Sequence, residues 1–322
     1  MLHFLAQVLG VLIRQRPVHA FSLILVFLFC GAALRAAPVM KDVVYSTEGG
    51  QKQRLDVYFP PDHVPTKSPL RAAVLCIHGG AWRSGGKSDM AVFAEALAQK
   101  GYVSVCISYR LFDPEKHPEN VWPAQYDDAQ RAVRWMRANA GQLWIDAGRI
   151  AAMGASAGGH LVALLGTTDT RAGLERPAYH GHSSRVNAVV DVFGPTDLTK
   201  DFTRLKLGSA TVQSLVDDFV GSKKPAAEIA QARLAASPVR YVDAKTVPFL
   251  IFHGAKDTIV PVEQSRLLEA ALKRNGTACT YIEWEAEGHG LGAPGSLASF
   301  VDETGRFLAK TIGKKTDSQP GK

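Results

Sequence analysis

A serine lies at the centre of the segment with the clearest chemical potential, Gly154-Ala155-Ser156-Ala157-Gly158. The segment follows a predicted strand at 149–153 and opens a helix-period run at 157–165, which predicts a strand, a sharp turn and a helix. Small neighbours on both sides of Ser156 allow a tight turn. At the start of a helix, backbone N–H groups favour developing negative charge. The spacing therefore predicts a serine nucleophile.

A glycine-rich loop, His78-Gly79-Gly80-Ala81-Trp82, directly follows the apolar run at 72–77. Glycines at a strand end let backbone amides point into a cleft. With the amide of Ala157, which follows the serine, such donors can form an oxyanion hole. A dinucleotide phosphate loop is the alternative, but its GxGxxG spacing is absent.

A serine nucleophile needs a base, and the base needs an acid that orients it. Asp257 follows the apolar run at 249–252, and His289 follows the run at 280–284. Both therefore lie just past strand ends, in the order serine, acid, histidine. We expect His289 to be the base and Asp257 to hold its tautomer.

Other acids and histidines fit these roles less well. Glu263 and Asp243 are the alternative acids. His78 and His253 each precede a glycine at a strand end, which favours a role in bracing a turn. His160 lies on the helix after the serine, which favours packing or a place in a pocket wall.

The elements that must position these residues alternate along the chain. Short apolar runs predict buried strands at 72–77, 102–107, 150–153, 188–193, 249–252 and 280–284. Helix-period segments lie at 90–99, 123–143, 157–165 and 262–274, and Gly141 is a plausible helix stop in the second. This alternation predicts an α/β fold with a mostly parallel central sheet and helices on both faces.

Two parts of the chain depart from that alternation. Half-buried strands are predicted at 42–46 and 54–59, joined by a hairpin at Gly49-Gly50. From 196 to 246 no buried strand is predicted, and amphipathic patterns favour helices near 212–219 and 226–236. We expect this stretch to be a small helical cap insertion over the C-terminal edge of the sheet.

Taken together, these motifs resemble the α/β-hydrolase esterases of the hormone-sensitive-lipase-like group. The chain is most similar to bacterial esterases related to bifunctional feruloyl esterase/acetylxylan deacetylases, over about residues 40–312. The segments that carry the resemblance are His78–Trp82, Tyr109–Leu111, Pro123–Asp128, Gly154–Gly159, Phe193–Asp197 and His253–Asp257.

The resemblance implies a serine carboxylesterase that forms an acyl-enzyme on Ser156 and acts on small-molecule esters. It implies no metal and no organic cofactor. The family's oxyanion amides correspond to Gly80, Ala81 and Ala157. One departure is Ala81, where the lipase-like group often has a third glycine.

Two alternatives to a carboxylesterase remain. The His-Gly-Gly-x-Trp loop also occurs in kynurenine formamidases, so a formamidase or amidase on the same scaffold is one alternative. A non-catalytic ligand-binding protein of this fold is the other, although a complete triad argues against it. Substrate contacts are expected from Trp82, Phe112 and His160.

The N-terminal segment predicts export. An uncharged apolar run at 20–34 follows Arg14 and Arg16 and precedes small residues, as in a secretory signal peptide. The run is shorter than the ~20 residues of a membrane span. We therefore divide the chain into a signal peptide or uncleaved signal anchor at 1–37 and a hydrolase domain at 38–322. The protein is expected to be periplasmic or secreted, or anchored to the membrane by this segment.

Charge and cysteine content exclude several other classes. The formal net charge of the chain is +7, and three arginines in 1–37 supply part of it. The basic residues of the remaining chain are dispersed and form no cluster. A nucleic-acid partner is therefore not expected. Four cysteines without CxxC or Cys/His ligand spacing predict neither a disulfide scaffold nor a zinc site. The sequence leaves the oligomeric state open.

Overall fold

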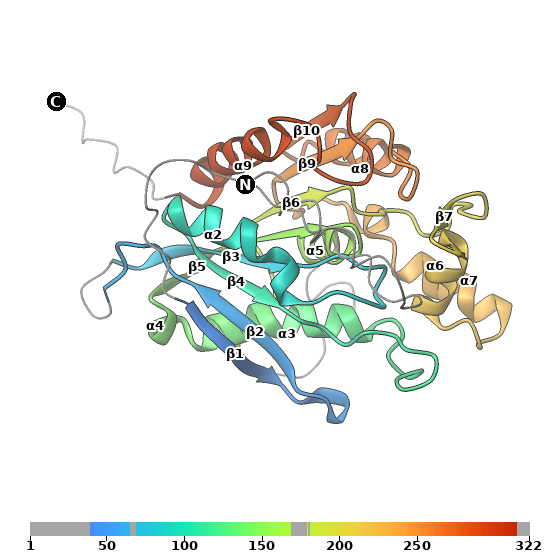
Figure 1. Ribbon diagram of the computed structural model, residues 1–322, viewed down its shortest axis with the longest axis horizontal. Helices are drawn as coiled ribbons and strands as arrows, with labels where there is room; N and C mark the ends of the chain where they lie inside the picture. Colours follow the sequence, from blue (N-terminus) through green and yellow to red (C-terminus); the bar gives the residue numbers. More distant parts are fainter. Residues whose placement is uncertain (1–38, 65–68, 169–178, 180, 314–322) are drawn as a thin grey trace, which may run out of the picture. The chain divides into compact units, whose positions relative to one another are not determined.

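An eight-stranded sheet forms the centre of the computed structural model, which describes residues 39–64, 69–168, 179 and 181–313. The strand order is β1-β2-β4-β3-β5-β6-β9-β10, and Figure 1 shows the sheet with its flanking helices. The strands are β1 (Val39–Ser46), β2 (Gln53–Tyr58), β3 (Arg71–Ile77), β4 (Val103–Ile107), β5 (Ile145–Ala155), β6 (Ala188–Val192), β9 (Phe249–Gly254) and β10 (Cys279–Trp284).

Six of these strands are parallel neighbours, from β4 across to β10, and β1 and β2 add an antiparallel edge. Parallel strands place their carboxyl ends at the same edge of the sheet. The loops after β3, β5, β6, β9 and β10 therefore meet at one edge, as in other open α/β sheets with a ligand site there.

Helices cover both faces of the sheet, and each face has its own apolar cluster. Helices α3, α5 and α8 contribute to one cluster, while α2 and α9 contribute to the other. The helices are α2 (Ala91–Gln99), α3 (Ala124–Ala138), α4 (Ala140–Leu143), α5 (Ala157–Thr167), α6 (Val212–Val220), α7 (Ala226–Ala235), α8 (Glu263–Arg274) and α9 (Ser296–Ile312). The predicted fold class is confirmed.

The predicted edge strands are present, but β2 is more buried than its alternating pattern indicates. The hairpin forms at Gly49 and Gly50, whose φ values of 64° and 70° suit glycine. Asp56 lies between the apolar residues Leu55 and Val57 in β2, yet it is buried as they are. Its carboxylate lies 2.9 Å from the Lys87 ammonium, which compensates the buried charge.

The helix predicted over 123–143 is divided in two. Helix α3 ends before Asn139, whose side-chain amide donates to the Trp135 carbonyl at 2.8 Å, and α4 begins at Ala140. Gly141 lies inside α4 and is not the stop. Asparagine competes for backbone hydrogen bonds, so it ends a helix well.

Two helices form in the cap insertion, at the positions that the amphipathic patterns predict. Figure 1 shows α6 and α7 together at one end of the sheet, beside the short hairpin of β7 (Lys206–Leu207) and β8 (Ala210–Thr211). The buried side chains of α6 include Val212, Val216 and Phe219.

The predicted signal peptide or anchor at 1–37 lies outside the described residues. The chain divides into two units, Met1–Arg35 and Ala36–Lys322, and only the second contains described residues. Among those residues, no helix combines the length and the apolar character that crossing a membrane needs.

Candidate active site

Ser156 occupies the turn between β5 and α5, as predicted. Its φ of 56° and ψ of −119° are rare for a residue with a side chain. Such a conformation costs on the order of 1–3 kcal/mol and persists only where its surroundings impose it. The turn projects the hydroxyl group at the carboxyl edge of the sheet and at the first turn of α5.

Three glycines make this sharp turn possible, because a Cβ atom at each would collide with neighbouring backbone or side-chain atoms. At Gly154 it would lie 2.3 Å from the Gly158 carbonyl oxygen, and at Gly158 it would lie 2.1 Å from the Ile77 oxygen. At Gly159 it would lie 2.5 Å from an oxygen of Asp191. The small residues seen in the sequence are therefore a packing requirement of the turn.

The structure brings Ser156, His289 and Asp257 together in one hydrogen-bonded chain. The Ser156 hydroxyl lies 2.9 Å from Nε2 of His289, and Nδ1 of the same ring lies 2.6 Å from Oδ2 of Asp257. Because the carboxylate accepts from Nδ1–H, Nε2 is left as the acceptor for the serine proton. The arrangement is suited to transfer of that proton to the imidazole.

The Asp257 carboxylate is fixed from both sides. Its Oδ1 accepts backbone N–H groups of Ile259 and Val260 at 2.8 and 2.9 Å. Burial alone raises the pKa of a carboxyl, but hydrogen bonds from His253 and His289 hold the pKa of Asp257 below its ordinary range. Asp257, rather than Glu263 or Asp243, is therefore the acid that faces the His289 ring.

His253 braces the Asp257 loop, in line with its predicted turn-bracing role. Its Nε2–H points at the Val260 carbonyl, 2.9 Å away, and lies 3.2 Å from Oδ2 of Asp257. Its Nδ1 lies 2.7 Å from the Ser265 hydroxyl. The buried ring thereby ties the loop after β9 to the start of α8.

Glu287 organises the loop that carries His289, a role that sequence reasoning missed. The carboxylate is buried and accepts the N–H groups of Gly292 and Ala293 at 3.2 and 2.7 Å and the Ser296 hydroxyl. It thus closes the loop between β10 and α9. The only signal in the sequence is an acid two residues before the histidine, and many exposed loops carry such an acid.

The glycine-rich loop after β3 lies directly against the serine turn. A Cβ atom on Gly79 would come within 3.2 Å of the Ser156 Cβ. Gly80, Ala81 and Trp82 then have φ values of 100°, 50° and 59°, so the loop bends sharply around the serine.

A hydrophobic stack and a buried histidine hold this loop in place. The Trp82 indole stacks on Phe219 of α6 with ring centroids 4.2 Å apart. His78 is buried and stacks on Tyr109 at 4.3 Å, and burial lowers the pKa of its imidazole. Ala157 is the first residue of α5, so its N–H has no acceptor within the helix. Of the predicted oxyanion donors, Ala81 and Ala157 line the same cavity as Ser156, and the role of all three stays a prediction.

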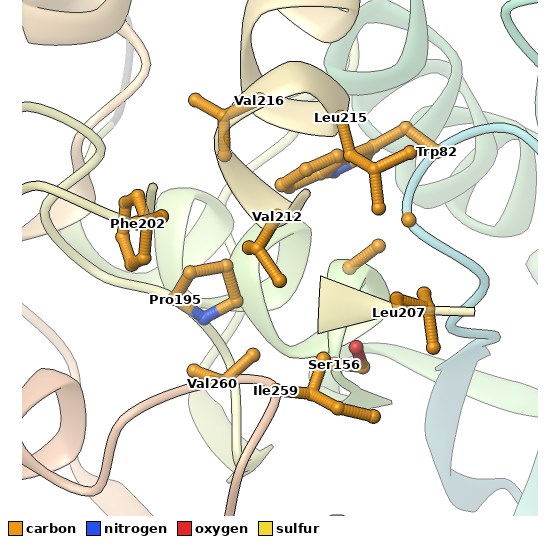
Figure 2. A pocket seen from close by; sticks show the side chains of 12 residues that line it. Trp82, Ser156, Pro195, Phe202, Leu207, Val212, Leu215, Val216, Ile259 and Val260 are labelled. Carbon is orange, nitrogen blue, oxygen red and sulfur yellow. The ribbon is translucent and has the colours of Figure 1, made fainter. Parts of the chain in front are cut away.

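An apolar cavity opens beside the serine, which we call the Ser156 cavity (Figure 2). Its volume is about 420 Å³ including its open mouth. Cap residues form much of its wall, including Phe202, Leu207 and Val212. The full lining is Ala81, Trp82, Ser156, Ala157, Pro195, Phe202, Leu207, Val212, Leu215, Val216, Ile259 and Val260.

Of the predicted substrate contacts, Trp82 lines the Ser156 cavity, while Phe112 and His160 are not among its lining residues. Phe112 is buried, with the Arg83 guanidinium 5.5 Å from its ring centre. His160 is covered by the Trp82 ring, and its Nε2 lies 2.6 Å from the Ala236 carbonyl. Burial lowers the pKa of His160 to about 4, so the ring is a neutral packing element.

No group of three or more His, Cys, Asp or Glu side chains among the described residues could hold a metal ion.

Comparisons with known proteins show the family to which the chain is similar. The BD-FAE family model matches residues 55–272. The esterase LipQ of Mycobacterium tuberculosis is 30% identical over 90% of this chain, and the chain spans about two thirds of the length of its first curated relatives, 67% for LipQ.

Solved structures of esterases have the same fold. A truncated carbohydrate esterase from gut microbiota is 26% identical, with a TM-score of 0.73 over 88% of this chain and 99% of its own. Esterase 2 of Thermogutta terrifontis is 28% identical, with a TM-score of 0.69 over 88% of this chain and 95% of its own, and it has also been solved phosphorylated by paraoxon. The chain therefore belongs to the BD-FAE family of hormone-sensitive-lipase-like α/β hydrolases, and its similarity to these proteins places it among the serine ester hydrolases.

Proposed function

We propose that the protein is a carboxylesterase that acts through a Ser156–His289–Asp257 triad and a covalent acyl-enzyme. The observation that carries this proposal is the unbroken hydrogen-bond chain from the serine hydroxyl to the buried carboxylate. That chain ends beside a cavity whose lining is mostly apolar, as an acyl group requires.

In the first step, the Ser156 oxygen attacks the ester carbonyl carbon while its proton moves to Nε2 of His289. The negative charge that develops on the carbonyl oxygen is held by the backbone N–H groups of Gly80, Ala81 and Ala157. Loss of one such donor typically costs about 3–4 kcal/mol of transition-state stabilisation. Asp257 stabilises the imidazolium formed on His289.

In the second step, the bond to the alcohol oxygen breaks, and the proton on His289 passes to that oxygen. The acyl group stays on Ser156 as an ester. Water then enters, gives its proton to His289 and attacks the acyl carbon, and the carboxylic acid leaves as the serine hydroxyl is restored. No step consumes a cofactor.

Replacement of the nucleophile gives the direct test. Ser156→Ala should lower kcat on short-chain nitrophenyl esters by about 10⁴-fold or more, since the nucleophile and base act as a unit. Circular dichroism and Tm should show an intact fold. Ser299→Ala, at an exposed position on α9, is the matched control and should keep wild-type rates. Retention of substantial ester hydrolysis in folded Ser156→Ala would overturn the assignment.

A formamidase or amidase is the second candidate, favoured by the Trp82 at the end of the His-Gly-Gly-x-Trp loop. The same triad can serve both reactions, because only the leaving group differs. A side-by-side measurement of kcat/KM on an aryl formate ester and on the formanilide with the same aryl group separates the two. For an esterase, the ratio of kcat/KM for the ester to kcat/KM for the formamide should exceed the ratio of the two uncatalysed hydrolysis rates by several orders of magnitude.

We also propose that residues 1–37 direct export, with cleavage after Ala36 or retention as an anchor. The apolar run at 20–34 and its arginine flank support this proposal. Fractionation of the expressing bacterium followed by N-terminal sequencing tests it. A mature chain beginning at Ala37 indicates a cleaved signal peptide, an intact chain in the membrane fraction indicates an anchor, and an intact cytosolic chain contradicts both.

A further inference from the structure

We propose that a second cavity next to the serine binds the alcohol part of the ester, and that this alcohol is apolar rather than a sugar or an anion. We call it the Asp89 cavity. It has a volume of about 670 Å³ including its open mouth. The proposal rests on the esterase function proposed above. The lining residues are Gly79, Asp89, Met90, Phe93, Met153, Ala155, Val192, Phe193, Gly290, Leu291 and Phe300.

The two cavities lie on opposite faces of the sheet and share no lining residue. Trp82, Ala157 and Val216, which line the Ser156 cavity, belong to the apolar cluster under α3, α5 and α8. Met90 and Phe300, which line the Asp89 cavity, belong to the cluster under α2 and α9. Of the two cavities, only the Ser156 cavity is lined by Ser156 itself, which directly follows β5.

The two residues that flank Ser156 line different cavities. Ala155 lines the Asp89 cavity and Ala157 lines the Ser156 cavity. Gly79, whose backbone closely approaches the serine side chain, also lines the Asp89 cavity. A substrate carbonyl at Ser156 thus has one cavity for each of its two substituents.

The position of His289 decides which substituent enters which cavity. The alcohol oxygen must come within hydrogen-bond distance of Nε2, since it takes its proton from that nitrogen. Gly290 and Leu291, which follow the histidine, line the Asp89 cavity. So does Phe193, whose ring centre lies 4.5 Å from that of His289. The alcohol therefore leaves toward the Asp89 cavity, and the acyl group occupies the Ser156 cavity.

The lining defines the chemical class of the alcohol. It presents aromatic rings from Phe93, Phe193 and Phe300, together with methionine and aliphatic side chains. Among the described lining residues, no side chain can donate a hydrogen bond, and the one charge is the exposed carboxylate of Asp89. The Asp89 carboxylate is the one side-chain group that could accept from a sugar hydroxyl, so the other hydroxyls of a sugar would lose water without gaining side-chain partners, and an anion would be repelled. Aryl and alkyl alcohols fit.

Acetate esters that share the acyl group and differ in the alcohol test this inference. We expect kcat/KM for benzyl acetate to exceed that for ethyl acetate by about tenfold or more, because ring burial adds binding in the transition state. An acetylated methyl xyloside and 4-(acetoxymethyl)benzoate should both be poorer substrates than benzyl acetate. Folded wild-type protein that hydrolyses none of these esters would contradict the esterase function itself.

Variants in the cavity wall locate the effect. Phe93→Ala should lower the benzyl-to-ethyl ratio of kcat/KM by about fivefold or more. Leu291→Ala, in the loop after His289, provides the same test if the first variant folds poorly. Val92→Ala, next to Phe93 on α2 but 53% exposed, is the control and should keep the wild-type ratio. The inference is overturned if active wild-type enzyme shows no preference for benzyl acetate, or if the folded wall variants keep the ratio.

Discussion

Asp191 is a buried carboxyl at the end of β6, beside the serine turn, and the proposed mechanism does not use it. Its Oδ1 accepts the Gly194 N–H at 2.9 Å, while Oδ2 has no hydrogen-bond partner among the described residues. The same Oδ1 is the atom that leaves no room for a side chain at Gly159. Burial raises the pKa of Asp191 to about 6.

This raised pKa predicts a stability cost at neutral pH. An unfolded aspartate has a pKa of about 3.9, so between about pH 4 and 6 the folded state binds a proton that the unfolded state has lost. Stability from this group is therefore present at low pH and is lost as the pH rises through 6. Asp191→Asn stays neutral and should raise the free energy of unfolding by about 1–3 kcal/mol at pH 8.

Urea unfolding at two pH values checks this prediction. At pH 4.5 wild-type Asp191 is largely protonated in the folded state, but most unfolded chains have lost that proton, so the difference between Asp191→Asn and wild type should fall to about a third of its value at pH 8. An equal difference at pH 4.5 and pH 8 would show that the substitution acts through packing and not through the charge.

The sequence was sufficient to predict where the three triad residues lie, because each of them follows a strand. Ser156, Asp257 and His289 are placed by the carboxyl ends of β5, β9 and β10, and parallel strands bring those ends together whatever the details of packing. Phe112 and His160 carry no such marker. Whether an aromatic ring faces a cavity or is covered by another ring depends on tertiary contacts that one sequence does not display.

At the level of elements, the glycine-rich loop and cap helix α6 are joined by two contacts. Trp82 stacks on Phe219, and the neighbouring Arg83 guanidinium lies 3.0 Å from Oδ2 of Asp218. Because Ala81 and Trp82 have positive φ values, the loop depends on such contacts to keep its shape. The cap thus contacts the loop that supplies the proposed oxyanion donors.

Asp218→Asn should therefore lower kcat more than it lowers stability. The Arg83–Asp218 pair is partly exposed, so its loss should change the free energy of unfolding by no more than about 1 kcal/mol. A small displacement of an oxyanion donor can still cost about three- to tenfold in kcat. Steady-state kinetics on a nitrophenyl ester and urea unfolding measure the two effects.

Asp217→Asn is the matched control for Asp218→Asn. Asp217 is the adjacent residue on α6 and pairs with Arg233 of α7, inside the cap. Its substitution should leave kcat within about twofold of wild type, because it does not touch the loop. Equal losses of kcat in the two variants would contradict the prediction, because the loss would then follow from any change in the cap and not from the contact between Arg83 and Asp218.

Element boundaries were less predictable than element identity. Apolar residues recur every three or four positions from 129 to 143, on both sides of Asn139, so the apolar pattern alone could not reveal the break between α3 and α4. Helix α9 was not predicted, although Phe300, Leu308 and Ile312 lie on one buried face. Thr304 interrupts that face in the sequence, yet it is fully buried.

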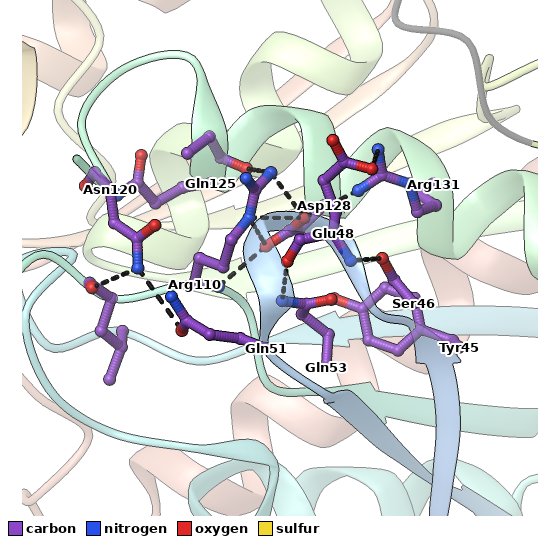
Figure 3. A network of polar contacts seen from close by, with 12 residues as sticks. Tyr45, Ser46, Glu48, Gln51, Gln53, Arg110, Asn120, Gln125, Asp128 and Arg131 are labelled. Atoms are coloured by element: carbon purple, nitrogen blue, oxygen red, sulfur yellow. Dashed lines mark hydrogen bonds and ion pairs between the residues drawn. The ribbon is translucent and has the colours of Figure 1, made fainter. Parts of the chain in front are cut away.

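At the scale of the whole molecule, a buried ionic network joins the antiparallel edge of the sheet to the face under α3 (Figure 3). The Arg110 guanidinium makes contacts of 2.9 Å with both oxygens of Asp128, which is fully buried on α3. Arg131 lies 3.1 Å from the same carboxylate and 3.3 Å from Glu48 in the β1–β2 turn. The network thus fixes three parts of the chain that are distant in sequence.

Removing the central carboxylate of this network should strongly destabilise the fold. Asp128→Ala leaves the Arg110 charge, which is 10% exposed, without its buried partner, and such a loss typically costs about 3–5 kcal/mol. Urea unfolding at pH 7 measures it. Glu303→Gln, which breaks the exposed pair with Arg306 on α9, is the control and should change stability by less than about 1 kcal/mol.

The loss of stability in Asp128→Ala should come more from the unpaired charge of Arg110 than from the lost attraction between Arg110 and Asp128. A double variant separates these two contributions. Ion pairs in a dry interior gain little over apolar side chains of similar volume, because desolvation opposes the Coulomb energy. Arg110→Met combined with Asp128→Leu should therefore recover part of the stability that Asp128→Ala loses. If the double variant is less stable than Asp128→Ala, the hydrogen bonds that Arg110 makes to Asp128 and to the Ala124 carbonyl, 3.0 Å away, outweigh the desolvation of the pair.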